Sequence, residues 1–212
     1  MAGKTVLILG GGVGGLVAAN RLRRLLPAEH RVVVVDKSRQ HSFAASYLWV
    51  MVGSRTPQDI SVELPRLLAK GVEYLQARVL AIDLAKRQVK TDAAEIAYDY
   101  LIIALGAEVN PEAAAGLSPA DTFCELEGAL KLRDTLRSFS QGRVAILVSS
   151  LPFKCPAAPY EAAFLIDSVM RQKGARSQVE IEVFTPEAQP MPVAGPALGE
   201  AVKEMMAQRA IA

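Results

Sequence analysis

Short runs of apolar residues alternate with glycines and with a longer amphipathic segment at the start of the chain. Thr5–Leu9 and Arg31–Asp36 are short, rich in strand-forming residues and almost wholly apolar, which predicts two strands buried on both faces. Between them, residues 16–26 repeat apolar positions at helical spacing and end before Pro27, with arginines on the other face. Strand, helix and strand predict a βαβ unit with a right-handed crossover, and therefore an α/β fold.

The pattern after this unit is weaker. Residues 38–53 show no clear periodicity, and residues 61–70 predict a short helix interrupted at Pro65. Short strand-like pieces separated by polar turns follow, which predicts a small antiparallel meander that leads back to the main sheet. These pieces are Val79–Asp83, Gln88–Thr91, Glu95–Ala97 and residues 100–105, the last of them ended by Gly106.

A second unit of the same kind follows a break in periodicity. Pro111, Gly116 and Pro119 interrupt the chain between residues 110 and 120, so we expect one domain over residues 1–115 and another over residues 116–212. Two tandem units of this kind predict two Rossmann-like domains, each with a parallel sheet. The second reads as helix 125–139, strand 143–148, loop 149–159, helix 160–172, strand Val179–Phe184 and a closing helix from about Pro196.

Composition narrows the functional classes. With 51% hydrophobic residues, 22% charged residues and a net charge of +2, the 212-residue chain is neither a disordered tail nor a strongly basic nucleic-acid binder. Two cysteines and two histidines are too few for a disulfide-stapled fold or a convincing zinc site. No run reaches the roughly 18 apolar residues of a membrane span, and the first strand begins too early for a signal peptide. We therefore expect a globular cytoplasmic protein.

The turn after the first strand is built of glycine. Gly10, Gly12 and Gly15 give the spacing G-x-G-x-x-G between a predicted strand and a predicted helix, and Asp36 ends the next strand about 20 residues further on. In such a loop the first glycine permits a tight turn, the second lets the backbone approach a pyrophosphate, and the third allows close packing of the helix. The N–H groups at the start of the helix receive the phosphates. The acid accepts hydrogen bonds from a ribose, so the pattern predicts a dinucleotide site.

The glycine loop alone does not distinguish FAD from NAD. Residues 98–107 resemble the strand and turn that adjoin FAD in flavoproteins with two dinucleotide-binding domains, with Leu105 in place of the usual threonine. The corresponding loop of the second unit, residues 149–159, has no glycine and contains three prolines, which offer no backbone N–H to a phosphate. We therefore expect FAD in the first unit and no nicotinamide in the second.

The second loop carries a cysteine where glycines would bind phosphate. Cys155 follows Lys154 and precedes a helix that Pro159 is suited to start. A neighbouring ammonium and a helix N-terminus both favour the thiolate, so a redox-active thiol is one interpretation. The other interpretation is a small buried residue without chemistry, which is the usual role of a single cysteine.

Three segments together resemble one family of flavoproteins. Residues 152–163 around Cys155, residues 185–196, and residues 41–53 look like the sulfide:quinone oxidoreductases and their relatives, the flavocytochrome c sulfide dehydrogenase flavoprotein subunits. The similarity extends over nearly the whole chain. The Lys-Cys-Pro loop is its most specific element, because many flavoproteins share the glycine loop.

This resemblance implies an FAD-dependent enzyme that oxidises sulfide to polysulfide or sulfur and passes electrons to a quinone or a cytochrome. It implies that Cys155 is catalytic and that Cys124 lies near the flavin, although Cys124 fits an unreactive residue at a helix start equally well. His41 and Trp49 are candidates for the flavin region, and packing explains them at least as well. The residues expected to bind FAD are Gly10, Gly11, Gly12, Gly14, Gly15, Asp36, Lys37, Val79, Ala104, Leu105 and Gly106.

Length separates this chain from the family that it resembles. Family members are far longer than 212 residues, and their C-terminal half completes the FAD domain, supplies a partner for Cys155 and carries the quinone pocket and a membrane-docking surface. We expect the chain, which stops at Ala212 in or just after a helix, to be an amino-terminal fragment. Peripheral membrane association and a homo-oligomer stay open. The alternatives are an NADH:quinone oxidoreductase, disfavoured by the loop without glycine, and a non-catalytic nucleotide-binding domain.

Overall fold

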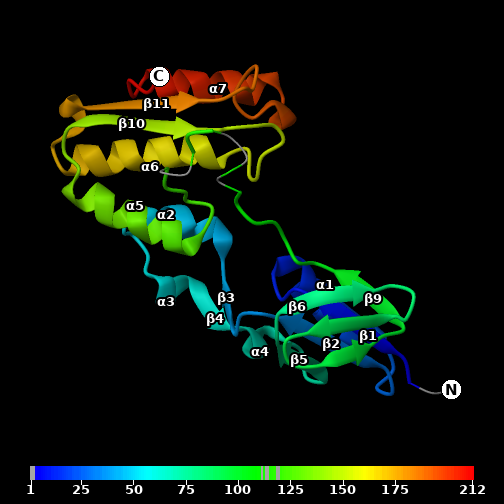
Figure 1. Ribbon diagram of the computed structural model, residues 1–212. Coiled ribbons are helices and arrows are strands. Elements are labelled where there is room, and N and C mark those ends of the chain that lie inside the picture. Colours follow the sequence, from blue (N-terminus) through cyan, green and yellow to red (C-terminus); the bar gives the residue numbers. More distant parts are fainter. Residues whose placement is uncertain (1–2, 111, 113–114, 118–119) are drawn as a thin grey trace. The chain divides into compact units, whose positions relative to one another are not determined.

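The computed structural model describes residues 3–110, 112, 115–117 and 120–212, which form two compact units (Figure 1). The first unit comprises Met1–Phe43 and Gln58–Glu108, and the second comprises Ala44–Pro57 and Val109–Ala212. The stretch Ala44–Pro57 thus joins the second unit, an arrangement that no local pattern indicates. The expected boundary between residues 110 and 120 falls partly on residues 111, 113–114 and 118–119, outside the described residues, and it stays a prediction.

A four-stranded parallel sheet forms the centre of the first unit, in the order β5-β2-β1-β9. β1 (Thr5–Leu9) pairs in parallel with β2 (Arg31–Asp36) and with β9 (Tyr100–Ile103), and β5 (Val72–Gln76) lies on the far side of β2. β1 and β2 are buried along almost their whole length, as their apolar sequences predict. The α/β class is confirmed.

Alternate side chains of the central strands contribute to two separate cores, because successive residues of a strand point to opposite faces of the sheet. On one face, Ile8 and Val34 pack with Leu16 of α1 (Val13–Leu25). On the other face, Leu9 packs with Val89 of the meander. The meander is antiparallel and consists of β6 (Val79–Asp83), β7 (Gln88–Thr91) and β8 (Glu95–Ala97).

The segment between β2 and β5 is more ordered than its sequence indicates. Residues 38–53, expected to be irregular, contain β3 (Gln40–Ser42), a 3-10 turn at Ala44–Ser46, and α2 (Tyr47–Met51). β5 was not expected, because it is a short edge strand without buried positions and its pattern is only half apolar.

The prediction of a helix over residues 61–70 is wrong for its first part. The chain there forms β4 (Ser61–Glu63), which pairs antiparallel with β3 and is preceded by the short helix α3 (Pro57–Ile60). The helix α4 (Leu64–Leu67) then has Pro65 in its first turn. A proline is tolerated there because the N–H that it lacks would have no partner within the helix.

The second unit contains the parallel pair β10 (Gly142–Leu147) and β11 (Val179–Phe184), connected through α6 (Ala158–Gln172). Figure 1 shows α6 on one side of the two strands and α7 (Pro196–Ala207) on the other. α7 ends at Ala207, and Ile211 forms a parallel bridge to Ile181, so the last residues lie beside β11 rather than in a helix. The remaining elements are α5 (Leu126–Ser138), which packs against α2, and the 3-10 turns Arg176–Gln178 and Pro192–Ala194.

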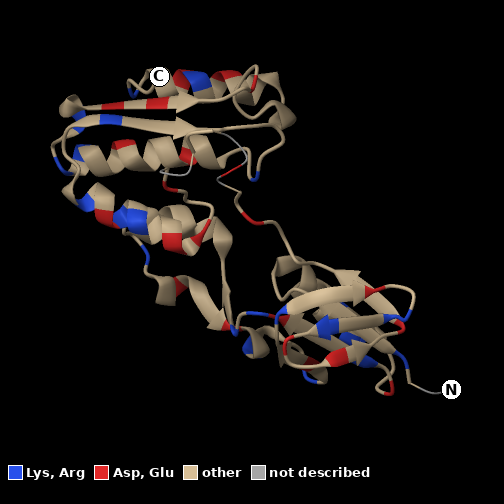
Figure 2. Ribbon diagram, viewed as in Figure 1, with Lys and Arg blue, Asp and Glu red and all other residues tan. Residues whose placement is uncertain are grey.

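Charged residues are distributed over both units with the two signs interspersed (Figure 2). β1 carries no charged residue, and β2 carries Arg31 and Asp36 only at its two ends. None of the helices in the described ranges is long and apolar enough to cross a membrane. The charge of Asp36 is thus placed where β2 ends and the adjoining loops begin.

Candidate functional site

The glycine loop connects the C-terminal end of β1 to α1. Gly10 has a φ of 100°, and its N–H donates to the carbonyl oxygen of Val35 at the end of β2 (2.8 Å). A Cβ at Gly10 would overlap the carbonyl oxygen of Ala104, and a Cβ at Gly15 would overlap the carbonyl oxygen of Gly10. The close approach of the protein's own backbone therefore requires both glycines.

Gly12 differs from these two glycines because nothing inside the protein requires it. It is the N-cap residue of α1, its φ of −69° and ψ of −173° are open to any residue, and a Cβ there would have no atom within 4 Å. Among the described residues, none accepts a hydrogen bond from its N–H, and the first turn of α1 contains no acidic residue. The start of α1 therefore presents unpaired N–H groups and the positive end of the helix dipole, which suit an anion.

Asp36 lies beside this loop because β1 and β2 are neighbours in the parallel sheet. Its Oδ2 accepts a hydrogen bond from the N–H of Gly11 (2.6 Å), and its Oδ1 accepts one from the N–H of Ser38 (2.7 Å). A carboxylate has about four acceptor positions, so capacity remains for hydroxyl donors. The acid thus shapes the loop and keeps the ability to accept further hydrogen bonds.

The turn after β9 reaches the same edge of the sheet. The N–H of Ala104 donates to the carbonyl oxygen of Leu9 (2.7 Å), and a Cβ at Gly14 would lie 3.8 Å from that of Ala104. Leu105 is exposed and Gly106 has a φ of 77°. The structure therefore brings together two segments that are far apart in the sequence and that both follow parallel strands.

Two other expected cofactor residues have partners within the protein. The Lys37 ammonium forms an ion pair with Glu108 (3.2 Å) at the surface. Val79 is half-buried, and its side chain packs against the core under the sheet. A role of either residue in binding FAD stays a prediction.

Two side chains that contact Gly11 did not emerge from the glycine pattern. His41 on β3 places its Nδ1 3.1 Å from the carbonyl oxygen of Gly11. A methyl group of Leu64 occupies the position where a Cβ of Gly11 would lie. The signal for both is weak, since His41 lies in a segment without periodicity and Leu64 precedes a proline.

Cys155 lies in the loop between β10 and α6, two residues before the N-cap residue Ala157. It is exposed, its φ is 61°, and its carbonyl oxygen accepts a hydrogen bond from the N–H of Ala158 (3.0 Å). A left-handed backbone is uncommon for residues other than glycine, and such positions cluster at functional sites. The thiol is therefore accessible, and the interpretation of Cys155 as a buried packing residue is wrong.

Cys124 lies in the second unit as well, just before α5. It is half-buried, and its N–H donates to the Oγ1 of Thr122 (3.1 Å). Gly128 in the first turns of α5 approaches the carbonyl oxygen of Thr122 so closely that no Cβ fits. Both cysteines of the chain are free thiols.

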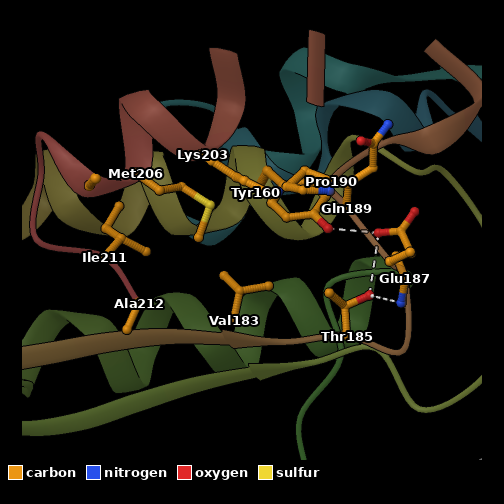
Figure 3. Close-up of a pocket in the computed structure, with 12 residues that line it drawn as sticks. Tyr160, Val183, Thr185, Glu187, Gln189, Pro190, Lys203, Met206, Ile211 and Ala212 are labelled. Atoms are coloured by element: carbon orange, nitrogen blue, oxygen red, sulfur yellow. Dashed lines mark hydrogen bonds between the residues drawn. The ribbon is translucent and has the colours of Figure 1, made fainter. Parts of the chain in front are cut away.

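A cavity of about 310 Å³ lies at the C-terminal end of β11 (Figure 3). The Tyr160 hydroxyl, from the first turns of α6, donates to the Oε2 of Glu187 (2.6 Å), and Thr185 approaches the same oxygen (3.3 Å). Burial raises the pKa of Tyr160 far above its usual value, and the hydrogen bond to Glu187 raises it further, so the phenol stays protonated. This contact connects the loop after β11 to the helix that follows Cys155, and the sequence pattern did not reveal it.

No group of three or more His, Cys, Asp and Glu side chains in the described part of the chain is arranged to hold a metal ion. The structure therefore contains two candidate sites. The first unit has a site suited to an anion with an acidic side chain beside it, and the second unit has an exposed thiol at the start of a helix. Each site lies at the C-terminal ends of parallel strands, where α/β proteins bind their ligands.

Comparisons with known proteins identify relatives for both units. The family model of the pyridine nucleotide-disulphide oxidoreductases matches residues 4–147, and a model of the central part of the sulfide dehydrogenase (flavocytochrome c) flavoprotein chain matches residues 129–188. The mitochondrial sulfide:quinone oxidoreductase of Mus musculus is 30% identical over 186 residues, which are 83% of this chain and 40% of that protein. A type II NADH:quinone oxidoreductase of Staphylococcus saprophyticus is 26% identical over 136 residues, 63% of this chain and 33% of that protein.

The crystal structure of the sulfide:quinone oxidoreductase of Aquifex aeolicus superposes with a TM-score of 0.87 at 27% identity, over 98% of this chain and 50% of that one. The chain thus spans half or less of the length of these relatives. The match of the first family model covers more than half of the chain and includes the glycine loop, Asp36 and the turn after β9. This chain therefore belongs to the pyridine nucleotide-disulphide oxidoreductase family, and its similarity to the sulfide:quinone oxidoreductases is confirmed.

Proposed function

We propose that this chain is the FAD-binding and sulfur-handling part of an enzyme that oxidises sulfide and passes the electrons through FAD to a quinone. The observation that carries the cofactor assignment is Gly12: the fold has no use for a glycine there, yet the position borders unpaired N–H groups at the start of α1. A pyrophosphate needs close backbone approach and such N–H groups. The residues present therefore fit a dinucleotide.

The chain's own residues would hold FAD as follows. The N–H groups near Gly12 bind the pyrophosphate, and Asp36 accepts hydrogen bonds from the ribose. Its charge also disfavours a 2′-phosphate, as in NADP. When bound, FAD supplies a two-electron acceptor. The further residues proposed to line its site are Gly10, Gly11, Gly14, Gly15, Lys37, Val79, Ala104, Leu105 and Gly106.

Cys155 is the proposed redox residue. In the oxidised enzyme its sulfur would be bonded to a second sulfur, and the resemblance to the sulfide:quinone oxidoreductases implies that a cysteine of a C-terminal half provides it. Hydrosulfide attacks this bond, so one new S–S bond forms, the old bond breaks, and the displaced sulfur leaves as a thiolate. Two electrons per sulfide then have to leave the sulfur centre. The exposed thiol and the adjacent start of α6 support this role, because both favour attack at this sulfur.

Cys124 is the second proposed cysteine of the site, near the flavin. The acceptor is proposed to be a quinone, because the sulfide:quinone and NADH:quinone oxidoreductases among the relatives share that acceptor in their names. A cytochrome is the alternative that the flavocytochrome c match supports. Attachment of the enzyme to a membrane surface is part of the same proposal, because quinones are dissolved in the apolar interior of membranes.

Anaerobic flavin bleaching tests the proposed reaction. We expect the purified full-length enzyme, of which this chain is proposed to be a part, to be yellow and to lose its flavin absorbance with sulfide. Cys155→Ser should keep its FAD and still bleach with dithionite, which shows that the flavin site is intact, but should lose at least about 99% of the sulfide-driven rate because a hydroxyl cannot form the S–S bond. Normal bleaching of this variant by sulfide would refute the role of Cys155.

The same measurement separates the rival functions. The similarity to type II NADH:quinone oxidoreductases favours NADH as a second candidate donor. However, the loop after β10 contains prolines (Pro152 and Pro156) and no glycine. Because a proline has no backbone N–H to donate to a phosphate, this loop is poorly suited to bind NADH. Bleaching by NADH and not by sulfide would establish that alternative, and a colourless protein that binds no flavin would leave a non-catalytic nucleotide-binding domain.

A further inference from the structure

The peptide between Gly11 and Gly12 is not held in one orientation by its own two residues, because both are glycines. A flip of this peptide changes ψ of Gly11 and φ of Gly12, and glycine tolerates almost any value of either angle. The peptide is trans, so the carbonyl of Gly11 and the N–H of Gly12 point in opposite directions. Whatever holds the Gly11 carbonyl therefore also decides the direction of the Gly12 N–H.

His41 provides that contact. Its Nδ1 lies 3.1 Å from the carbonyl oxygen of Gly11. A carbonyl oxygen only accepts hydrogen bonds, so the ring must donate, and the neutral ring must carry its proton on Nδ1. On the other side of the same residue, Asp36 accepts the hydrogen bond from the N–H of Gly11 (2.6 Å). Each of the two peptides that flank Gly11 is thus fixed by one side chain.

The element that carries His41 is itself well anchored. β3 pairs with β4, with His41 opposite Val62, and hydrogen bonds from Phe43 to Ile60 and from Leu64 to Arg39 close both ends of the ribbon. Leu64, which directly follows β4, is 1% exposed and fills the position of a missing Cβ at Gly11. The β3–β4 ribbon therefore reaches Gly11 with a hydrogen-bond donor and with a methyl group.

We propose that His41 is a positioning residue for the bound dinucleotide: its Nδ1–H fixes the Gly11–Gly12 peptide and so orients the Gly12 N–H toward the pyrophosphate. This role rests on the proposed binding of FAD. Preorganisation of a donor improves affinity because the cost of ordering it is met before the ligand arrives. His41 acts through the backbone of the glycine loop, so its effect should lie in FAD affinity.

The first measurement needs no ligand. Long-range ¹H–¹⁵N NMR of the ring nitrogens at alkaline pH should find the proton of His41 on Nδ1. His30, the other histidine of the chain, is a built-in control, because its Nδ1 accepts the hydrogen bond from the N–H of Lys4 (2.9 Å) and its proton must lie on Nε2. A proton on Nε2 of His41 would overturn the proposal whether or not FAD binds.

The second measurement is the dissociation constant for FAD of the flavin-free protein, from the quenching of flavin fluorescence. We expect His41→Ala to raise this constant about five- to tenfold, the effect of one lost hydrogen bond. His41→Asn, whose Nδ2 occupies the position of Nδ1, should stay within about twofold, and so should His30→Ala. Thermal unfolding without FAD shows whether each variant is folded.

The outcomes separate the two proposals. Unchanged FAD affinity in His41→Ala, or equal losses in the Ala and Asn variants, would refute the positioning role and leave FAD binding intact. A wild-type protein that binds no FAD would refute the proposed function, and the role of His41 with it, even if the proton lies on Nδ1.

Discussion

Gly12 and Gly15 have the same side chain and opposite structural roles. At Gly15 a Cβ would overlap a backbone carbonyl, whereas at Gly12 it would meet no atom within 4 Å. Gly15 is therefore required for folding, whereas Gly12 is available to serve a ligand. A glycine motif read from sequence does not distinguish these roles, because spacing alone does not reveal what lies next to each Cα.

We expect Gly15→Ala to lower the free energy of unfolding by about 2–3 kcal/mol, because the carbonyl of Gly10 is part of a tightly packed turn and can move little. Gly12→Ala should change it by less than about 1 kcal/mol, since its conformation is open to alanine. Gly12→Ala should nevertheless weaken FAD binding at least tenfold, because the methyl group stands where the pyrophosphate approaches.

Urea unfolding and flavin fluorescence titration measure the two effects separately. Gly12→Ala serves as the stability control for Gly15→Ala. If Gly12→Ala bound FAD as tightly as the wild type, the open edge of the loop would not be the pyrophosphate site.

Asp167 is the clearest case in which one side chain holds several elements together. It lies on α6 with no exposed surface and accepts hydrogen bonds from Arg171 (2.8 Å), Arg176 (2.6 Å) and Arg209 (3.0 Å). Arg176 also donates to the carbonyl oxygens of Val179, Arg209 and Ala210. The cluster therefore ties α6 to the start of β11 and to the turn after α7.

Burial alone would raise the pKa of Asp167, but hydrogen bonds from the three arginines outweigh it and lower the pKa below 3.8. A carboxylate whose pKa is lower in the folded state stabilises the fold fully above its unfolded pKa, and this contribution is lost as the pH falls through the folded value. The cluster should therefore support the second unit at neutral pH and lose this effect below about pH 4.

Asp167→Asn should lower the free energy of unfolding by about 3 kcal/mol at pH 7, because it leaves the arginines with a neutral partner. The difference from the wild type should shrink below about pH 4. Asp134→Asn is the matched control: Asp134 forms its ion pairs on the exposed surface of α5, where such pairs contribute about 0–1 kcal/mol. Urea unfolding as a function of pH measures the free energy of unfolding of both variants. Equal losses in the two variants would show that the buried cluster stabilises the protein no more than a surface ion pair does.

Across the whole molecule, two βαβ units share one architecture and differ in the loop that follows the first strand. The loop after β1 has glycines and a helix start with unpaired N–H groups, whereas the loop after β10 has prolines and an exposed cysteine in a left-handed conformation. The loop after β1 can thus offer N–H groups to an anion, whereas the loop after β10 offers an exposed thiol.

This difference predicts how adenine dinucleotides protect the chain from hydrogen exchange. FAD should slow amide exchange in residues 10–16 and near Asp36, because bound phosphate occupies the N–H groups there. NADH at millimolar concentration should leave residues 149–159 unchanged. Mass spectrometry of peptides from both loops, with ADP as a control for binding through adenine alone, provides the comparison. Protection of residues 149–159 by NADH would contradict the proposed division of roles.

Some parts of the fold were open to prediction because their signals are local. The strands β1, β2 and β11 and the three meander strands β6, β7 and β8 are confirmed to the residue, whereas β9, β10 and the long helices deviate by a few residues at their ends. β3, β4 and α2 were not predictable in the same way. They are short, and their order comes from pairing and packing with distant segments rather than from their own periodicity.

The amino-acid sequence by itself determined the α/β class, the glycine loop, the acid at the end of β2 and the family, because each depends on residue types at fixed spacing. Only the tertiary structure decided that Gly12 is open while Gly15 is enclosed, that Cys155 is exposed in a left-handed turn, and that His41 and Leu64 meet at Gly11. Those facts depend on which strands become neighbours. A residue's contacts across a sheet or a ribbon are set by the packing of the whole unit, and no local pattern records them.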